Sequence, residues 1–294
     1  MAQGVAPAPG TDRPIAVIAG AGDLPRAIAE LLRRKGRAVH VVAVEGEADR
    51  DYSDFPNTRL KMGAARQLKR ALREWGCVEV TMAGAFRRPK FSEIEFDLGT
   101  MKLALSRVFG LKFGGDDAVM GGVVRIFEEE GFRIVGPRQI VPEIIAGKGQ
   151  KGRLKPSRQA QDDIHAGVAA IARIGPLDIG QSLVIVDRRI VAVEAAEGTT
   201  AMIDRCAELR ANGRIPAPPP SGVLVKMLKP GQETRVEMPV IGPDTLRAAA
   251  RAGLSGIAVE AGGVVLVDHG ELGALADELD LFLIGIPPAD ASKP

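Results

Sequence analysis

Ile-Ala-Val-Ile-Ala-Gly-Ala-Gly-Asp-Leu-Pro, residues 15–25, decides the fold of the first half of the chain. An apolar run ends in two closely spaced glycines, and Pro25 follows where the first turn of a helix is expected. At that position the missing N–H of proline costs nothing. The stretch therefore predicts a buried strand over 14–19, a tight glycine turn, and a helix over 25–35 that ends before Gly36.

The same alternation continues through the first half. Apolar residues at helical spacing (Leu68, Ala71, Leu72 and Trp75) separate predicted strands. Strands separated by helices of this length predict a Rossmann-like parallel sheet with helices on both faces. The further predicted strands are 38–44, 78–83 and 132–135, and the further predicted helices are 98–108 and 117–130.

Small and acidic residues follow the predicted strands at the edge where such sheets bind ligands. Gly20-x-Gly22 is half of a dinucleotide fingerprint, but Pro25 replaces the third glycine and Asp23 would repel a pyrophosphate. These departures disfavour NAD(P) and favour a nucleoside or single nucleotide. The alternative is a tight turn that merely needs small residues. The candidate binding residues are Gly20, Gly22, Asp23, Ala83, Gly84, Ala85, Gly115 and Asp116.

The second half reads as a different α/β module with a mixed sheet. Ser157 can cap a helix that runs to Ile174, and Thr199 and Thr200 are placed to cap a later one. The predicted domains are a disordered tail over 1–13, a Rossmann-like nucleotide-binding domain over 14–145, a linker over 146–156 and a catalytic α/β domain over 157–290. Within the last, we predict a hairpin over 183–194, strands over 256–259, 264–267 and 282–286, and helices over 245–251 and 272–279.

Cations gather at the end of one apolar run in this module. The run Val223–Val225 leads into Lys226 and Lys229 before a Pro-Gly turn, and a second run, 236–241, carries Glu237 among apolar neighbours. Lysines and backbone amides are common partners of phosphate, and a half-buried acid can hold a metal. The segment therefore favours an anionic ligand, with an ordinary hairpin bearing solvated charges as the alternative.

The amino-acid composition further narrows the class of protein. The chain has 294 residues, enough for two domains. One Trp, one Tyr and an aromatic content of 4% disfavour a nucleic-acid surface built on base stacking. The two cysteines, Cys77 and Cys206, are typical of buried thiols in a reducing cytosol. No apolar run reaches the ~20 residues of a spanning helix, so we expect any membrane contact to be peripheral.

An ordered set of short motifs resembles one known family over residues 15–286. The chain is similar to the UDP-2,3-diacylglucosamine pyrophosphatases of lipid A biosynthesis, in the family unrelated to metallophosphoesterases. The motifs are Ile18-Ala-Gly-x-Gly-x-Leu-Pro25, Ala83-Gly84, Arg88-Pro89, Gly115-Asp-Asp117, Leu177-Asp-Ile-Gly-Gln181, Ala192-Val-Glu194, Glu197-Gly-Thr199, Val223-Leu-Val-Lys226, Lys229-Pro230, Arg235-Val-Glu-Met-Pro239, Ile241-Gly242, Ala252-Gly-Leu254 and Val259-Glu-Ala261.

The resemblance implies a two-domain hydrolase on the cytosolic face of the inner membrane. Water would attack the α-phosphorus of a lipidated UDP-sugar and release UMP and 2,3-diacylglucosamine 1-phosphate, with Mg²⁺ as cofactor. It assigns catalysis to Glu237, Lys226 and Gln181, with Glu237 also on the metal. It adds Gly180, Glu197, Thr199 and Lys229 to the substrate-binding residues.

Two positions depart from the family pattern. Glu237 stands where the family's Arg-x-Asp-x-Pro motif has aspartate, and Thr200 stands where Glu-Gly-Thr-Asp has aspartate. These changes leave open a non-catalytic binder of a nucleotide sugar or lipid. Other expectations are transient inner-leaflet contact through cations between Lys148 and Arg158, no nucleic-acid partner, and a possible homodimer.

Overall fold

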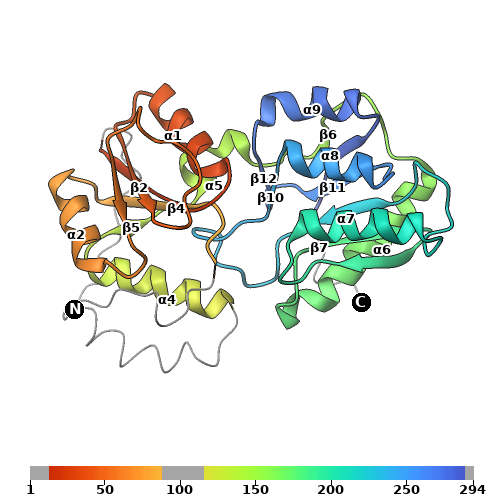
Figure 1. Ribbon diagram of the computed structural model, residues 1–294, viewed down its shortest axis with the longest axis horizontal. Helices are drawn as coiled ribbons and strands as arrows, with labels where there is room; N and C mark the ends of the chain where they lie inside the picture. The colour runs from red at the N-terminus through yellow and green to blue at the C-terminus, as the bar shows by residue number, and fades with distance from the viewer. Residues whose placement is uncertain (1–12, 88–115, 289–294) are drawn as a thin grey trace. The chain divides into compact units, whose positions relative to one another are not determined.

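A computed structural model describes residues 13–87 and 116–288 (Figure 1). The chain divides into two compact units. Unit 1 comprises the residues up to Pro142 together with Glu233–Glu237, and unit 2 comprises Glu143–Gln232 and the residues from Met238 onward. The predicted helix over 98–108 and the candidate site residue Gly115 lie outside the described ranges.

Unit 1 contains a five-stranded sheet in the order β3-β2-β1-β4-β5, and every pairing in it is parallel. Its strands are β1 Ile15–Ala19, β2 Val39–Val44, β3 Asn57–Leu60, β4 Glu79–Ala83 and β5 Arg133–Ile134. This arrangement confirms the predicted Rossmann-like sheet. The sequence pattern missed β3, because this short edge strand is polar and half exposed.

Helices connect these strands, as the sequence predicted. In α1 (Leu24–Arg34), the residues Ile28, Ala29 and Leu32 recur at helical spacing and are buried. The other helices of unit 1 are α2 (Ala65–Glu74), α4 (Asp116–Glu129) and α5 (Pro137–Ile140). None of the helices in the described ranges has both the length and the hydropathy of a membrane-spanning segment.

The amino ends of the unit 1 strands carry a buried charge cluster. Glu79, the first residue of β4, pairs with the Arg37 guanidinium and lies 3.3 Å from Arg133 Nη1. Arg37 and Glu79 are both buried. Because a buried carboxylate needs partners to offset its lost hydration, the two arginines supply the contacts that Glu79 requires inside the fold.

Unit 2 contains a six-stranded mixed sheet in the order β6-β13-β11-β9-β7-β8. Its central strands β13 (Phe282–Ile286), β11 (Gly256–Glu260) and β9 (Val223–Lys226) are parallel to one another. The flanking strands β6 (Gly149–Gln150), β7 (Ser182–Val186) and β8 (Arg189–Val193) pair antiparallel with their neighbours. The mixed sheet and the β7–β8 hairpin match the prediction.

Alternate residues of the central strands build two cores. Val223 and Val225 pack in the core that contains the apolar side chains of α6 (Arg158–Ile174), while Leu224 points into the opposite core. That opposite core is covered by α7 (Thr199–Ala211), α8 (Pro243–Arg251) and α9 (His269–Glu278), which Figure 1 shows side by side. The end of β9, where Lys226 lies, is therefore enclosed by apolar layers on both faces.

Two segments differ from the sequence prediction. The predicted linker over 146–156 contains β6, which pairs with β13 as an edge strand of the sheet. The run over 236–241 contributes only β10 (Val240–Ile241), which pairs parallel with β12 (Val265–Leu266) and not with β9. The 221–245 segment is therefore no hairpin, because its two runs belong to different sheets.

The buried cluster at Glu79 generates a stability prediction. Replacing Glu79 with alanine leaves two arginines without their shared carboxylate, so we expect a loss of about 3–5 kcal/mol in the free energy of unfolding. Urea denaturation measures it. The control is Glu74→Ala, which removes the exposed Arg70–Glu74 pair on α2 and should shift the midpoint far less. Equal shifts in both variants would contradict the structural role of Glu79.

Candidate functional site

Two loops meet at the carboxyl ends of β1 and β4 in unit 1. Ala21 and Ala85 form an isolated antiparallel bridge, with N–H···O distances of 2.9 and 3.0 Å. A Cβ on Gly20 would lie 2.5 Å from the Ala85 carbonyl oxygen, and one on Gly84 would lie 2.6 Å from that of Ala21. These two glycines therefore serve the close approach of the loops, as the tight-turn alternative proposed.

Gly22 differs from these two glycines. Its φ is +91°, and a Cβ there would have no heavy atom of residues 13–87 or 116–288 within 4 Å, so its outer side is open toward this part of the chain. Its N–H donates to Asp49 Oδ1 at 2.9 Å. Asp23, expected to accept a hydrogen bond from a ligand, pairs with Arg50 at 2.6 Å. The Gly22 N–H and the Asp23 carboxylate are therefore both paired within unit 1.

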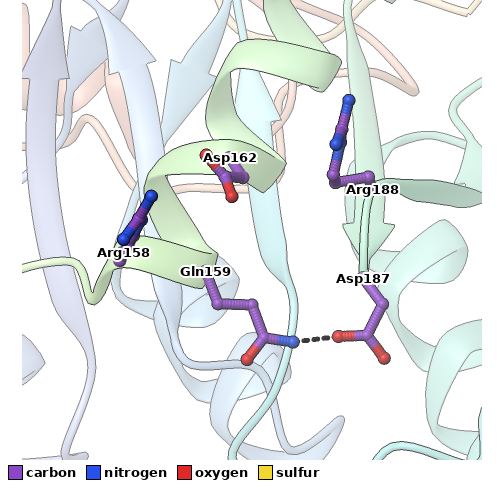
Figure 2. Close-up of a pocket in the computed structure, with 5 residues that line it drawn as sticks. All are labelled: Arg158, Gln159, Asp162, Asp187 and Arg188. Atoms are coloured by element: carbon purple, nitrogen blue, oxygen red, sulfur yellow. Dashed lines mark hydrogen bonds between the residues drawn. The ribbon is translucent and has the colours of Figure 1, made fainter.

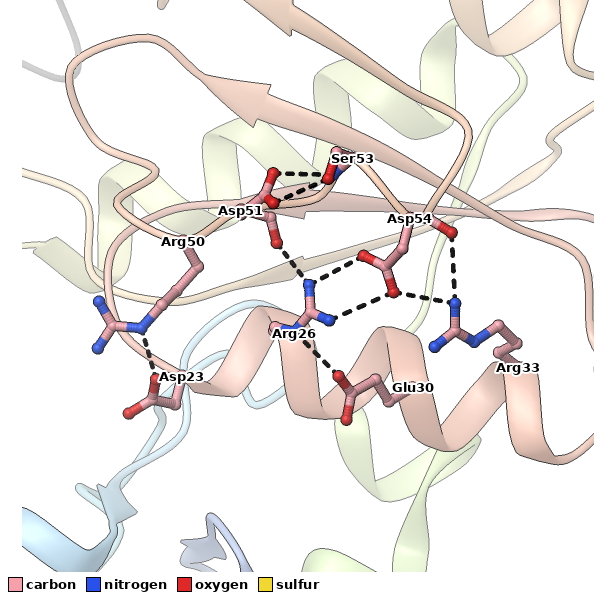
Figure 3. A network of polar contacts seen from close by, with 8 residues as sticks. All are labelled: Asp23, Arg26, Glu30, Arg33, Arg50, Asp51, Ser53 and Asp54. Atoms are coloured by element: carbon pink, nitrogen blue, oxygen red, sulfur yellow. Dashed lines mark hydrogen bonds and ion pairs between the residues drawn. The ribbon is translucent and has the colours of Figure 1, made fainter.

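The segment after β2 is fastened beside this turn by an ion network (Figure 3). Arg26 on α1 binds the Asp54 carboxylate, with Nη1 at 3.0 Å, and donates to the Asp51 carbonyl oxygen at 2.5 Å. Arg33, two turns along the same helix, lies 3.1 Å from Asp54 Oδ2. The network holds the segment after β2 against α1, the helix that begins directly after Asp23. The remaining candidate here, Asp116, begins α4, and its side chain lies outside the described positions.

Lys226 ends β9 inside unit 2 and is 4% exposed. Its ammonium donates to Thr199 Oγ1 at 2.6 Å, and the Thr199 hydroxyl donates to Glu194 Oε1, also at 2.6 Å. The other oxygen of Glu194 accepts from the Ser182 hydroxyl at 2.7 Å. Four side chains thus form one polar chain in an otherwise apolar setting: Ser182 of β7, Glu194 directly after β8, Thr199 at the start of α7 and Lys226 of β9.

The environment of Lys226 acts on its charge in two directions. Burial lowers the pKa of the Lys226 ammonium, because the charged form loses its hydration. The nearby Glu194 carboxylate raises this pKa and so partly offsets the effect of burial. A desolvated ammonium at a strand end is a strong partner for a phosphoryl oxygen.

Lys229 is also buried, at 6% exposure, and its Nζ lies 2.5 Å from Asp178 Oδ1. The alternative of a solvated charge therefore does not hold for Lys229, because the Gly175–Leu177 turn packs against Pro230 and brings Asp178 to it. Gln181 lies close by, and its Oε1 accepts from Gln232 Nε2 at 3.3 Å. The structure thus brings Lys226, Lys229, Gln181 and Thr199 to the same end of one sheet.

Gly180 and Glu197 have different settings. A Cβ on Gly180 would lie 2.0 Å from the Glu194 carbonyl oxygen, so this glycine allows the loop before β7 to touch the end of β8. Glu197 accepts from Ala195 N at 3.2 Å and pairs with Arg205 at 3.1 Å. The threonines do not cap α7 as predicted, because Gly198 precedes the helix and the Thr199 hydroxyl is bound to Glu194.

Glu237 lies in a turn of unit 1 and not on a strand. Its N–H donates to the Glu233 carbonyl oxygen at 3.0 Å, and one of its carboxylate oxygens is buried. The neighbouring Arg235 pairs with Glu233 and Glu128, both at 2.7 Å. Among the residues that the structure describes, no cluster of three or more His, Cys, Asp or Glu side chains could by itself hold a metal ion.

Sequence reasoning named the lysines but gave no role to three polar residues around them. Asp178 and Glu194 each lie between apolar neighbours, and Ser182 begins an apolar strand directly after Gln181. A polar residue at the edge of an apolar segment was the sequence feature that could have indicated a functional role. The pairing of β7 with β9, which sets Ser182 opposite Lys226, could not be read from the sequence.

A pocket of about 460 Å³ lies elsewhere on unit 2 (Figure 2). Arg158, Gln159 and Asp162 on α6 line it together with Asp187 and Arg188 of the β7–β8 turn. The antiparallel register sets this turn at the opposite end of β7 from Ser182, hence at the opposite end of the sheet from Lys226. Two arginines and two aspartates balance in charge, and no candidate site residue lines the pocket.

Comparison with known proteins places the whole described site in one family. Residues 14–150 match the family described as LpxI N-terminal domain, and residues 147–284 match the LpxI C-terminal domain. The chain is 38% identical over 278 residues to the UDP-2,3-diacylglucosamine pyrophosphatase LpxI of Caulobacter vibrioides, covering 95% of this chain and 99% of that protein.

A solved structure gives only a weak likeness. The crystal structure of the Bordetella bronchiseptica enzyme WbmH in complex with NAD⁺ matches 28% of this chain and 29% of its own, at 13% identity and a TM-score of 0.24. Such a low score carries no argument about this chain.

The two glycine environments in unit 1 generate a matched prediction. Gly22 and Gly84 have nearly equal φ angles, +91° and +90°, so alanine is strained equally at both. Only at Gly84 would the new Cβ also meet backbone atoms, at 2.6 and 2.8 Å. We expect Gly84→Ala to cost about 1–3 kcal/mol more than Gly22→Ala in the free energy of unfolding, by chemical denaturation. Equal losses would show that the loops separate without cost.

Proposed function

The chain belongs to the LpxI family of UDP-2,3-diacylglucosamine pyrophosphatases, and from that premise we propose the chemistry of its site. Water attacks the α-phosphorus of UDP-2,3-diacylglucosamine, and the bond from that phosphorus to the bridging oxygen breaks. The products are UMP and 2,3-diacylglucosamine 1-phosphate. The observation that carries the proposal is the buried ammonium of Lys226 at a strand end, at the same end of the sheet as Lys229 and Gln181.

Lys226 and Lys229 form the phosphate-binding part of this proposal. As charge develops on the phosphoryl oxygens, a fixed ammonium stabilises it without reorganising, and a desolvated setting strengthens that effect. Asp178 holds Lys229 until the diphosphate arrives, and Gln181 can donate its amide to a second oxygen. This part of the site binds and orients the diphosphate.

Glu237 supplies the carboxylate chemistry in our proposal. Mg²⁺ often binds through only one or two protein carboxylates, with substrate phosphates and water as its other ligands, so a single acid with a buried oxygen fits this role. When bound, the ion would neutralise diphosphate charge. Glu237 reaches one methylene further than the family's aspartate, and Thr200 supplies no carboxylate, so we expect metal affinity to depend chiefly on Glu237.

The nucleoside is assigned to the turn at Gly22 in unit 1. Its outer side is open, and the wall made by Asp23, Asp49 and Arg50 offers acceptors and a donor to the uracil imide and ribose hydroxyls. We assign Gly20 and Gly84 to the support of this turn, because they face neighbouring backbone.

Membrane contact and assembly complete the proposal. We propose a cytoplasmic protein with peripheral, transient contact to the inner leaflet, because the substrate's acyl chains start in the bilayer. Exposed cations lie from the residue before β6 to the start of α6, beside the exposed Leu154: Lys148, Arg153, Lys155 and Arg158. Each basic residue near an anionic surface contributes about 1 kcal/mol. Flotation with anionic vesicles at low and high salt tests the membrane contact. A homodimer is compatible with the proposed membrane contact.

The first functional prediction concerns Glu237. The purified protein with substrate and Mg²⁺ should release UMP, and Glu237→Ala should lower kcat by on the order of 10²-fold or more while substrate still binds. Chromatographic quantification of UMP measures the rate. The matched control, Glu233→Ala, removes an acid of the same turn that is paired with Arg235. If the wild-type protein binds substrate but releases no UMP, it is a binding protein, and the proposed hydrolase activity is wrong.

The second functional prediction compares the lysines. Lys226→Met and Lys229→Met both remove a buried ammonium from the same sheet end, but Lys229→Met also leaves Asp178 without this cation. We expect Lys226→Met to reduce kcat by on the order of 10²-fold, and Lys229→Met to act more on KM and on stability. Initial rates over a substrate series separate the two. The reverse pattern would assign the transition-state contact to Lys229.

A further inference from the structure

We infer that Glu194 is a positioning residue that holds the Lys226 ammonium in place through the Thr199 hydroxyl. The inference rests on the proposed function, because it explains how the phosphate-binding lysine is kept in its place. It assigns a role to Glu194 and Ser182, which stand outside the proposed substrate contacts.

The direction of each hydrogen bond follows from the available donors. The carboxylate of Glu194 only accepts, so the hydrogens of Thr199 and Ser182 both point to it, at 2.6 and 2.7 Å. Thr199 has one hydroxyl hydrogen, and that hydrogen is committed to Glu194. Its oxygen can therefore only accept, which is what the Lys226 ammonium requires. Thr199 thus orients the lysine and does not donate to the diphosphate.

This arrangement explains why Lys226 remains available to substrate. A direct ion pair with Glu194 would place the ammonium against a carboxylate that competes with phosphate. The intervening hydroxyl keeps the attraction of Glu194 while using one of the three N–H donors of the lysine. Two donors remain for phosphoryl oxygens, as far as the contacts of the described residues show. When the ammonium is fixed, its two remaining N–H groups define the direction in which phosphoryl oxygens are bound. A mobile ammonium defines no such direction.

The backbone fixes the acid as firmly as the side chains do. Glu194 N donates to the Ser182 carbonyl oxygen at 2.9 Å, and Ser182 pairs with Lys226 across β7 and β9. The polar chain is therefore attached to three neighbouring strands. A shift of any member moves the ammonium, and a displacement of about 1 Å can cost on the order of 10² in rate.

Single variants of the full-length protein test this role. Thr199→Val keeps the side-chain shape but removes the hydroxyl, and Glu194→Gln keeps the volume but removes the charge. We expect each to lower kcat by on the order of 10- to 100-fold with KM changed by less than about threefold. Thr199→Ser should restore the rate to within about threefold of wild type, because the hydroxyl returns. Thr58→Val on β3 and Glu208→Gln on α7 are the matched controls, at sites away from this chain of contacts.

Double variants separate positioning from a merely structural role. In a Lys226→Met background, Glu194→Gln should cause no further loss of kcat, because its effect passes through the lysine. Full activity of Thr199→Val, equal losses in Thr199→Val and Thr199→Ser, or additive losses with Lys226→Met would each overturn the inference. If Thr199→Val fails to fold, the isosteric Glu194→Gln carries the same cycle. Absence of UMP release by the wild-type protein would instead refute the proposed function, so the two failures are distinct.

Discussion

The desolvation of one ammonium group governs the polar structure of unit 2. Lys226 is buried at the end of β9, where apolar side chains of α6 lie on one face of the sheet and those of α7–α9 on the other. A charge in that position is tolerated only where hydrogen bonds and an opposite charge offset its lost hydration. Glu194 provides the charge, and Thr199 and Ser182 complete the hydrogen bonds. The pairing of β7 and β8 next to β9 is what delivers these residues.

Unit 1 meets a similar demand differently at the two ends of its sheet. At the amino ends, Glu79 is buried between Arg37 and Arg133, and the charges offset one another within the fold. At the carboxyl ends, glycines let two loops approach so closely that backbone groups satisfy each other. The first end is closed by its own partners, whereas at the second the turn at Gly22 has open space beside it, where we propose that the nucleoside binds.

The sequence predicted the features that local pattern controls. The apolar runs and glycine turns located β1, β2 and β4, and a run ending in lysine located the end of β9. It could not predict that Lys229 is buried, because that depends on the Gly175–Leu177 turn reaching Pro230 from a distant part of the chain. The polar edge strand β3 and the turn at Glu237 were missed for a related reason: tertiary pairing decides both. The sequence predicts a helix cap at Thr199. Its actual bond to Glu194 depends on strand register, which the local pattern does not show.

The segment Glu233–Glu237 constrains the order in which the two units can finish folding. These residues cluster with unit 1, although the chain on either side of them belongs to unit 2. Val236 packs against the unit 1 core, and a Cβ on Gly136 would lie 2.7 Å from the Cα of Arg235. A nascent chain therefore cannot finish its first folding unit when the Rossmann-like strands have left the ribosome. Unit 1 can be completed only after residue 237 has been synthesised. By then β7, β8 and β9 of unit 2 have been synthesised as well. The two units thus mature together, and a genetic exchange of the first 142 residues alone would transfer an incomplete core.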